Sequence, residues 1–110
     1  MKISKKSSYT DSQQEMALLF KALGHPARMA IMEFLLKVNA CICGDIVDEL
    51  PLAQPTVSQH LKELKNAGLI KGNIEGNTIC YCIDENRIEM LHQYFTIFSS
   101  NLIKKDNNCC

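Results

Sequence analysis

Apolar residues recur at helical spacing in the first part of the chain. Between Asp11 and Gly24 they are three or four positions apart, which is the spacing of one face of an α-helix, at Met16, Leu19, Phe20 and Leu23. Asp11 or Ser12 supplies the N-cap in this interpretation, and Gly24 ends the helix.

Two further helices are predicted before residue 52. The first begins near Pro26, a residue favoured in the first helical turn, and its expected buried stripe is Met29, Ile31, Met32, Leu35 and Leu36. The second is short, runs from about Gly44 to Leu50 and is stopped by Pro51. Its apolar side is formed by Ile46, Val47 and Leu50.

The fourth predicted helix spans about Gln54 to Ala67. Val57, Leu61 and Leu64 fall at positions i, i+4 and i+7, so they face the core. Gly68 follows as the C-terminal stop. Ala53 occupies the N-cap position, where Ser or Thr is expected. Because alanine has no side-chain acceptor, the helix lacks roughly 1 kcal/mol of N-cap stabilisation.

The pattern changes after Gly68. Two β-prone runs surround Glu75-Gly76-Asn77 and predict a β-hairpin. A long helix follows from about Glu85 to Ile103, and its apolar residues have the spacing of a two-helix seam: Ile88, Leu91, Phe95, Phe98 and Leu102. The order α-α-α-α-β-β-α predicts a mainly α winged helix-turn-helix, with the last helix left over for dimerisation.

The predicted organisation is a single domain between two flexible ends. We expect an N-terminal arm over residues 1–10, the DNA-binding and dimerisation domain over 11–103, and a cysteine-containing tail over 104–110. Because a chain of 110 residues buries a limited core, a homodimer with a shared core is favoured. No apolar run suits a signal peptide or a membrane span, so we expect a cytoplasmic protein without a membrane partner.

The fourth helix has the chemistry of a DNA reader. The formal net charge is zero, but residues 53–73 hold Lys62, Lys65 and Lys71 against a single acid, Glu63. Polar side chains near the start of the helix suit base edges and phosphates of double-stranded DNA. The candidate DNA-binding residues are Gln54, Thr56, Ser58, Gln59, His60, Lys62 and Lys65. His60 is equally suited to an internal hydrogen bond. The tip of the hairpin, Asn73 to Asn77, lacks the Arg or Lys that often enters the minor groove, which argues against a large contribution of the wing to affinity.

Six cysteines occur in three close pairs: Cys41 and Cys43, Cys80 and Cys82, and Cys109 and Cys110. In a cytosolic protein they are expected to be reduced thiols. Cys80 and Cys82 lie on one face of a predicted strand, where they serve either as ligands or as small buried hydrophobic residues. Cys41 and Cys43 flank the start of the short third helix, and Gly44 allows the distorted turn that joint ligation requires.

Four segments together resemble the ArsR/SmtB family of metal-responsive transcriptional repressors, over about residues 14–103. They are Leu23–Ile31 before the second helix, Cys43–Ile46 at the family's thiol site, Gln54–Leu64 in the recognition helix, and Ala67–Ile70 at the step into the wing. The resemblance implies a homodimer that binds an inverted-repeat operator and dissociates when an ion binds. Without gaps, the family's usual first thiol falls on Ile42, between the two cysteines.

The resemblance also narrows the choice of effector. A terminal-helix zinc site of the family needs His and Glu near the end of the last helix, and neither residue occurs beyond His92. The remaining candidate metal ligands are Cys41, Cys43, Cys109 and Cys110. Thiolates select soft ions, so the resemblance favours arsenite or antimonite, with cadmium, lead or zinc as further effectors.

Three other functions compete with a metal-responsive repressor. Oxidation of two thiols to a disulfide or a polysulfide bridge gives a redox-sensing or persulfide-sensing repressor of the same fold. A thiol enzyme is disfavoured, because the chain has neither a Cys-x-x-Cys motif nor an evident base beside a cysteine. A metal-storage protein would leave the recognition helix without a purpose.

Overall fold

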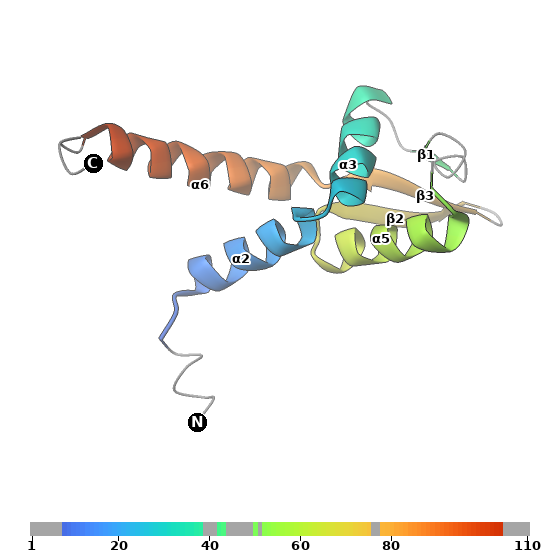
Figure 1. Cartoon of the computed structure of the whole chain (residues 1–110), viewed down its shortest axis with the longest axis horizontal. Helices are drawn as coiled ribbons and strands as arrows, with labels where there is room; N and C mark the ends of the chain where they lie inside the picture. Colours follow the sequence, from blue (N-terminus) through green and yellow to red (C-terminus); the bar gives the residue numbers. More distant parts are fainter. Residues whose placement is uncertain (1–7, 39–41, 44–49, 51, 76–77, 105–110) are drawn as a thin grey trace.

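The computed structural model describes residues 8–38, 42–43, 50, 52–75 and 78–104. Their helices and strands, in chain order, are α2 (Asp11–Leu23), α3 (Pro26–Val38), β1 (Ile42–Cys43), α5 (Gln54–Asn66), β2 (Ile70–Glu75), β3 (Thr78–Ile83) and α6 (Glu85–Lys104) (Figure 1). These elements form a winged helix. Apart from Leu50, the short helix predicted before Pro51 lies outside the described residues, as do the tips of both predicted flexible ends.

Local capping explains where the helices begin. The N-cap of α2 is Thr10 rather than the predicted Asp11 or Ser12. The Thr10 hydroxyl accepts a hydrogen bond from the Gln13 backbone N–H, and the Gln13 side-chain oxygen accepts one from the Thr10 backbone N–H. The N-cap of α5 is Ala53, which makes no side-chain hydrogen bond, as predicted. The chain leaves α5 through Gly68, whose φ of 85° suits a residue without a side chain.

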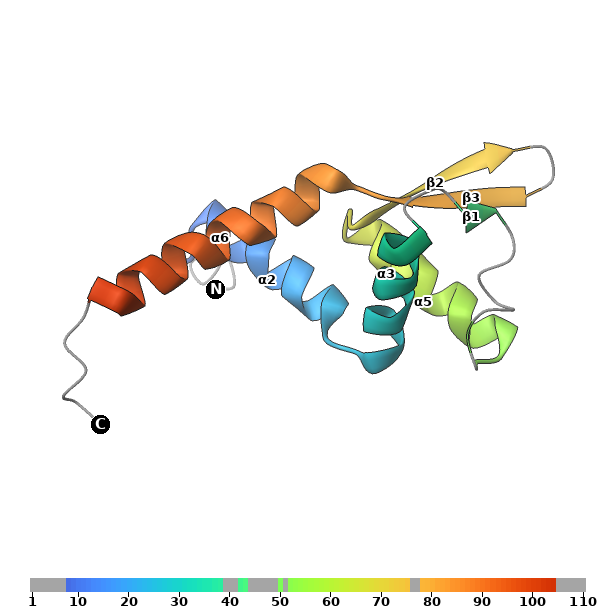
Figure 2. The same ribbon diagram turned by 90° about the horizontal axis from the view of Figure 1, so that it is seen from above.

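The hairpin belongs to a sheet with one more strand than the sequence predicts. Its strand order is β1-β3-β2, and both pairings are antiparallel. The short strand β1 places Cys43 opposite Cys80 and Ile42 opposite Tyr81. Consequently the segment that precedes the recognition helix is joined by backbone pairing to the second strand of the wing (Figure 2).

The core lies where α2, α3 and α5 meet the sheet. Val57, Leu61 and Leu64 of α5 are buried, as their spacing predicts. They belong to one cluster with α2 and α3 residues and with the strand entry: Met16, Leu19, Ile31, Met32, Leu35, Leu69 and Ile70. Met29 and Leu36 are exposed instead of buried. The inward face of α3 is therefore narrower than its apolar composition suggests.

The helix α6 extends away from this core, and α2 lies along its first half (Figures 1 and 2). The radius of gyration is 17.2 Å, against about 13 Å for a compact domain of 100 residues. None of the helices in the described ranges is long and apolar enough to cross a membrane.

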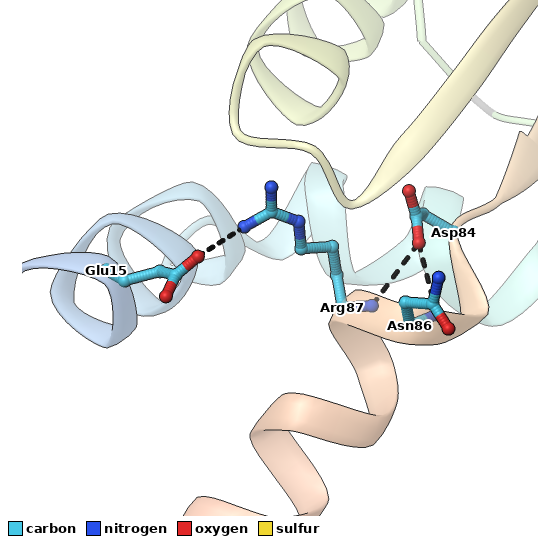
Figure 3. A network of polar contacts seen from close by, with 4 residues as sticks. All are labelled: Glu15, Asp84, Asn86 and Arg87. Atoms are coloured by element: carbon cyan, nitrogen blue, oxygen red, sulfur yellow. Dashed lines mark hydrogen bonds and ion pairs between the residues drawn. The ribbon is translucent and has the colours of Figure 1, made fainter. Parts of the chain in front are cut away.

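Arg87 connects the long helix to the rest of the molecule. Its guanidinium donates to the Glu15 carboxylate at 2.7 Å, and the two groups form an ion pair between α6 and α2 (Figure 3). Its Nε lies 3.1 Å from where a Cβ at Gly68 would be. Asp84 caps α6 by accepting from the backbone of Asn86 and Arg87 (Figure 3). The start of α6 is thus fixed against both α2 and the turn after α5.

Candidate nucleic-acid interface and thiol site

The structure places six of the seven predicted DNA-binding residues on the exposed side of α5. These side chains are Gln54, Thr56, Ser58, Gln59, Lys62 and Lys65. Gln59 donates to the Glu63 carboxylate one turn later, at 3.0 Å. This surface bond fixes the Gln59 amide on the outside of the helix, and its carbonyl oxygen and second N–H remain suited to a base edge.

The basic end of α5 lies beside the wing. A Cβ at Gly72 of β2 would lie 3.3 Å from the Lys65 Nζ, so the lysine extends over the first wing strand. Within the described part of the wing, the stretch Gly72–Ile74 that leads toward the tip carries no positive charge. The cations of this surface are therefore on the recognition helix and at Lys71, rather than toward the tip of the wing.

His60 differs from the other six residues because its side chain is only 8% exposed. Its Nδ1 accepts from the Arg28 Nε at 3.1 Å, and its ring lies 4.4 Å from the ring of His25. Burial, followed by the charges of His25 and Arg28, lowers the pKa of His60, whereas Glu63 raises it. Of the two roles open for His60, the structure provides an internal one: it holds α5 against the start of α3.

The four predicted metal ligands lie almost entirely outside the described residues. Cys41, Cys109 and Cys110 are not among them, and Cys43 is described only as part of β1. Cys80 and Cys82, by contrast, are both disulfide-bonded, which differs from the expected reduced thiols. Cys80 is 3% exposed and Cys82 is half-buried. Among the side chains that the structure describes, no three His, Cys, Asp or Glu residues gather as a metal site.

A second surface is apolar and lies on α6. Exposed side chains include Phe95, Ile97, Phe98 and Leu102. The rings of Tyr94 and Phe98 are stacked with centroids 6.0 Å apart, and Phe20 of α2 meets Phe95 edge-on at 5.3 Å. An open groove of about 420 Å³ runs beside them, lined by His92, Phe95, Thr96, Ser99 and Ser100. His92 is exposed at this surface.

Two features of this region were not predicted from the sequence. Strand β1 is two residues long, and its partner β3 lies far along the chain, so no periodicity reveals it. Arg28 was not among the predicted site residues, although its guanidinium bonds both His60 and the Ala22 carbonyl. The available signal was the family-like segment Leu23–Ile31, which contains Arg28.

Comparison with known proteins agrees with this geometry. Residues 25–71 match the model of the family described as bacterial regulatory protein, arsR family. An uncharacterized HTH-type transcriptional regulator of Methanocaldococcus jannaschii is 39% identical over 80 residues, covering 72% of this chain and 89% of that protein. The fold, recognition helix and wing therefore define a DNA-binding transcriptional regulator rather than an enzyme. The chain belongs to the ArsR/SmtB family.

Two repressors are also similar. The HTH-type transcriptional repressor SmtB of Mycobacterium tuberculosis is 39% identical over 70 residues, or 64% of this chain, which spans only 51% of that protein. The arsenical resistance operon repressor of Staphylococcus xylosus is 27% identical over 90 residues, covering 82% of this chain and 86% of that one. The relatives of this chain thus include a repressor that is named for arsenical resistance.

The fold itself matches solved structures. An ArsR family transcriptional regulator, RHA00566, superposes with a TM-score of 0.74 at 16% identity, covering 86% of this chain and 96% of that one. At this level of identity, the likeness supports the winged-helix fold alone.

Proposed function

We propose that the protein is a homodimeric, cytoplasmic repressor that binds an inverted-repeat operator and dissociates when cysteine thiolates bind a thiophilic ion. The observation that carries the DNA-binding part is the row of exposed polar and basic side chains along α5, beside the wing. Two copies related by a two-fold axis would present two recognition helices to half-sites about one helical turn apart.

The proposed division of labour follows the position of each side chain. Gln54, Thr56, Ser58 and Gln59 lie in the first two turns of α5, where side chains reach base edges. Lys62 and Lys65 follow toward its end and contact phosphates. Because His60 is buried against Arg28, its contribution is to hold the helix in place.

Two substitutions in α5 test the proposed DNA contacts. Binding is measured to an operator selected from random duplexes. Gln59→Ala is expected to reduce discrimination between the operator and a mutated site about tenfold, which is within the range of one bidentate base contact. Lys62→Ala should weaken binding to both duplexes and reduce the salt slope by about one. Fluorescence anisotropy at several salt concentrations measures both effects. Unchanged affinity and salt slope in both variants would place the reading face elsewhere.

The proposed sensor is the thiol pair at Cys41 and Cys43, with the tail thiols Cys109 and Cys110 as additional ligands. Soft ions prefer thiolates, and arsenite or antimonite is favoured over cadmium, lead and zinc because an arsenical resistance repressor is a relative. Strand β1, which contains Cys43, directly precedes the segment that leads into α5. An ion bound there is therefore well placed to change the orientation of the recognition helix.

Replacing both residues of this pair separates sensing from DNA binding. The double variant Cys41→Ser, Cys43→Ser is expected to bind the operator like the unmodified protein but to stay bound when arsenite or cadmium is added. The variant Cys109→Ser, Cys110→Ser should show a smaller loss of response. Normal release of the first variant by every ion would exclude Cys41 and Cys43 as the sensor.

A redox-sensing repressor of the same fold is the second candidate. The disulfide-bonded state of Cys80 and Cys82 favours it, because these thiols can be oxidised within the folded chain. Peroxide or persulfide would then release the operator in the absence of any metal. Treating the reduced protein–DNA complex with peroxide, and separately with arsenite, distinguishes the two signals.

A further inference from the structure

We propose that the effector ion binds on the three-stranded sheet, between Cys43 of β1 and the wing cysteines Cys80 and Cys82 of β3. This inference rests on the proposed function and identifies the ligands that complete its thiol site. It assigns a sensing role to the wing, which would take the place of the C-terminal tail as the source of the additional thiolates.

The strand register supports this site. Cys43 and Cys80 are directly opposite each other in the antiparallel β1–β3 pair. Residues opposite each other across such a pair have Cα atoms about 4.5–5.5 Å apart and share a face of the sheet. Cys82 is two residues beyond Cys80 on the same strand, so it belongs to the same face. The register therefore assigns three cysteines to one small area.

The disulfide bonds supply an independent observation. Cys80 and Cys82 are each disulfide-bonded, so each already has another sulfur atom within covalent reach. Cys43 is the residue whose Cα is paired with that of Cys80, and the expected separation of the two Cα atoms matches that of a disulfide. A small-molecule thiol reductant, which is itself oxidised to a disulfide, supplies the two electrons and two protons that turn such a bond into two adjacent thiols. Sulfur atoms around a tetrahedral soft ion are only about 3.8 Å apart, so a small movement is enough to hold the ion.

Three thiolates match the chemistry of trivalent arsenic. Arsenous acid exchanges its three hydroxyl groups for three thiolates: three As–O bonds break, three As–S bonds form, and the thiol protons leave with the hydroxyls as three water molecules. Cd²⁺ instead displaces the three protons directly. Cys80 is almost fully buried, so at least this ligand is shielded from water, which suits a soft ion more than a strongly hydrated one.

The site would connect sensing to DNA reading through the sheet. On one side, β1 leads into the segment before α5. On the other, β3 pairs with β2, whose Gly72 lies against Lys65 of α5. An ion bound between β1 and β3 therefore fixes the approach to the recognition helix relative to the wing. If this arrangement holds the two recognition helices of a dimer in an orientation that does not match two consecutive half-sites, the ion favours release of the protein from the operator.

Cadmium titration of the reduced full-length protein tests the ligands directly. Thiolate-to-cadmium charge-transfer absorbance reports bound thiolates, and competition with a chelator reports affinity. Cys82→Ser is expected to lower the absorbance by about a third, as one of three thiolates is lost, and to lower affinity at least tenfold. Cys109→Ser, Cys110→Ser is the decisive comparison: tail ligands predict a loss of absorbance and affinity in this variant, whereas the sheet site predicts that it retains both values. The opposite pattern, with the tail variant impaired and Cys82→Ser normal, would overturn the proposal.

Because Cys80 is buried, its replacement is checked for folding. Cys80→Ala preserves an apolar environment, and its circular dichroism and operator affinity without ion should match those of the unmodified protein. We expect it to lose cadmium absorbance as Cys82→Ser does. If Cys80→Ala unfolds, the half-buried Cys82→Ser variant still decides the question.

Oxidation provides a second readout. Hydrogen peroxide accepts two electrons and two protons from a pair of thiols and becomes two water molecules, while the thiols form a disulfide. Peptide mapping should then recover Cys43 linked to Cys80, and the oxidised protein should take up no cadmium until it is reduced. Cadmium uptake by the oxidised protein equal to that of the reduced protein would contradict a sheet site.

Operator release separates this inference from the proposed function. If arsenite or cadmium releases the unmodified protein but also releases Cys80→Ala and Cys82→Ser equally well, the sheet site is wrong and the repressor function stands. If no ion releases the unmodified protein, the proposed ion response itself fails.

Discussion

The DNA-reading half of the molecule and its long terminal helix bury their apolar residues to different extents. Val57 and Leu64 of α5 are fully buried among α2, α3 and the sheet. Phe98 and Leu102 of α6 are 59% and 64% exposed, although their spacing is just as regular. A single chain therefore completes the core around α5, which takes in Leu91 from the start of the α6 seam, and leaves Phe95, Phe98 and Leu102 of that seam exposed. The difference is consistent with a reading half that folds within one chain and with a later part of α6 that pairs in the homodimer we propose.

The exposed seam is ordered in the isolated chain. Tyr94, Phe95 and Phe98 contact one another, and Phe20 of α2 packs edge-on against Tyr94 and Phe95. Aromatic pairs of this kind contribute about 0.5–1.5 kcal/mol beyond the area they bury. The cluster presents a preformed apolar surface, so association with a second copy costs little additional side-chain ordering.

The largest expected effect comes from a charge in this seam. Phe98→Glu should convert a dimer into a monomer at micromolar concentration, because the interface would bury an unpaired carboxylate. Loss of the second recognition helix should lower operator affinity at least 100-fold, while the circular dichroism spectrum stays helical. Sedimentation and anisotropy measure the two effects.

A control on the same helix makes this prediction specific. Gln93 is exposed and lies about 140° around α6 from Phe98. Gln93→Glu should therefore remain dimeric and bind DNA normally. A dimeric Phe98→Glu variant with full operator affinity would show that α6 is not the dimer surface.

An intermediate effect is expected from His60 in the reading half. Burial, with His25 and Arg28, lowers the pKa of His60 in the folded protein, so the unfolded chain binds the proton more tightly. The stabilising contribution of neutral His60 is therefore complete above about pH 6.5, and is lost as the pH falls from there toward its lower folded pKa. Urea midpoints measured at pH 7.5 and pH 5.5 should fall on acidification.

Replacing this histidine assigns the slope. His60→Gln keeps an acceptor for Arg28 and should flatten the decrease in the urea midpoint. Identical slopes for His60→Gln and the unmodified protein would remove His60 as the cause.

The smallest expected effect is a gain of stability at the start of α5. Ala53→Ser supplies the missing cap acceptor and should stabilise the fold by about 1 kcal/mol, or roughly 4–8 °C in Tm. Ala17→Ser, in the exposed interior of α2, is the matched control and should not stabilise. Thermal unfolding compares the two variants, and equal Tm values would contradict the role of the cap.

The sequence predicted what depends on local patterns. The spacing of Val57, Leu61 and Leu64 and the stop at Gly68 defined α5, and the change to β-prone residues defined the wing. The pairing of Cys43 with Cys80 was missed, because it joins residues far apart in the chain and local periodicity carries no information about such pairs. The same limit applies to the side-chain environment. His60 falls among polar neighbours in the sequence, and only the packing of α5 against α3 shows that Arg28 and His25 surround it.

The central claim is that an ion bound by thiolates removes this regulator from DNA. Its most direct test is the affinity of the reduced, unmodified protein for its selected operator, measured by fluorescence anisotropy with and without arsenite. Our account predicts nanomolar-range binding without the ion and an increase in Kd of about 5- to 150-fold when arsenite is bound, which corresponds to a coupling free energy of about 1–3 kcal/mol. An operator affinity that is the same with and without arsenite, and with and without cadmium, would contradict it.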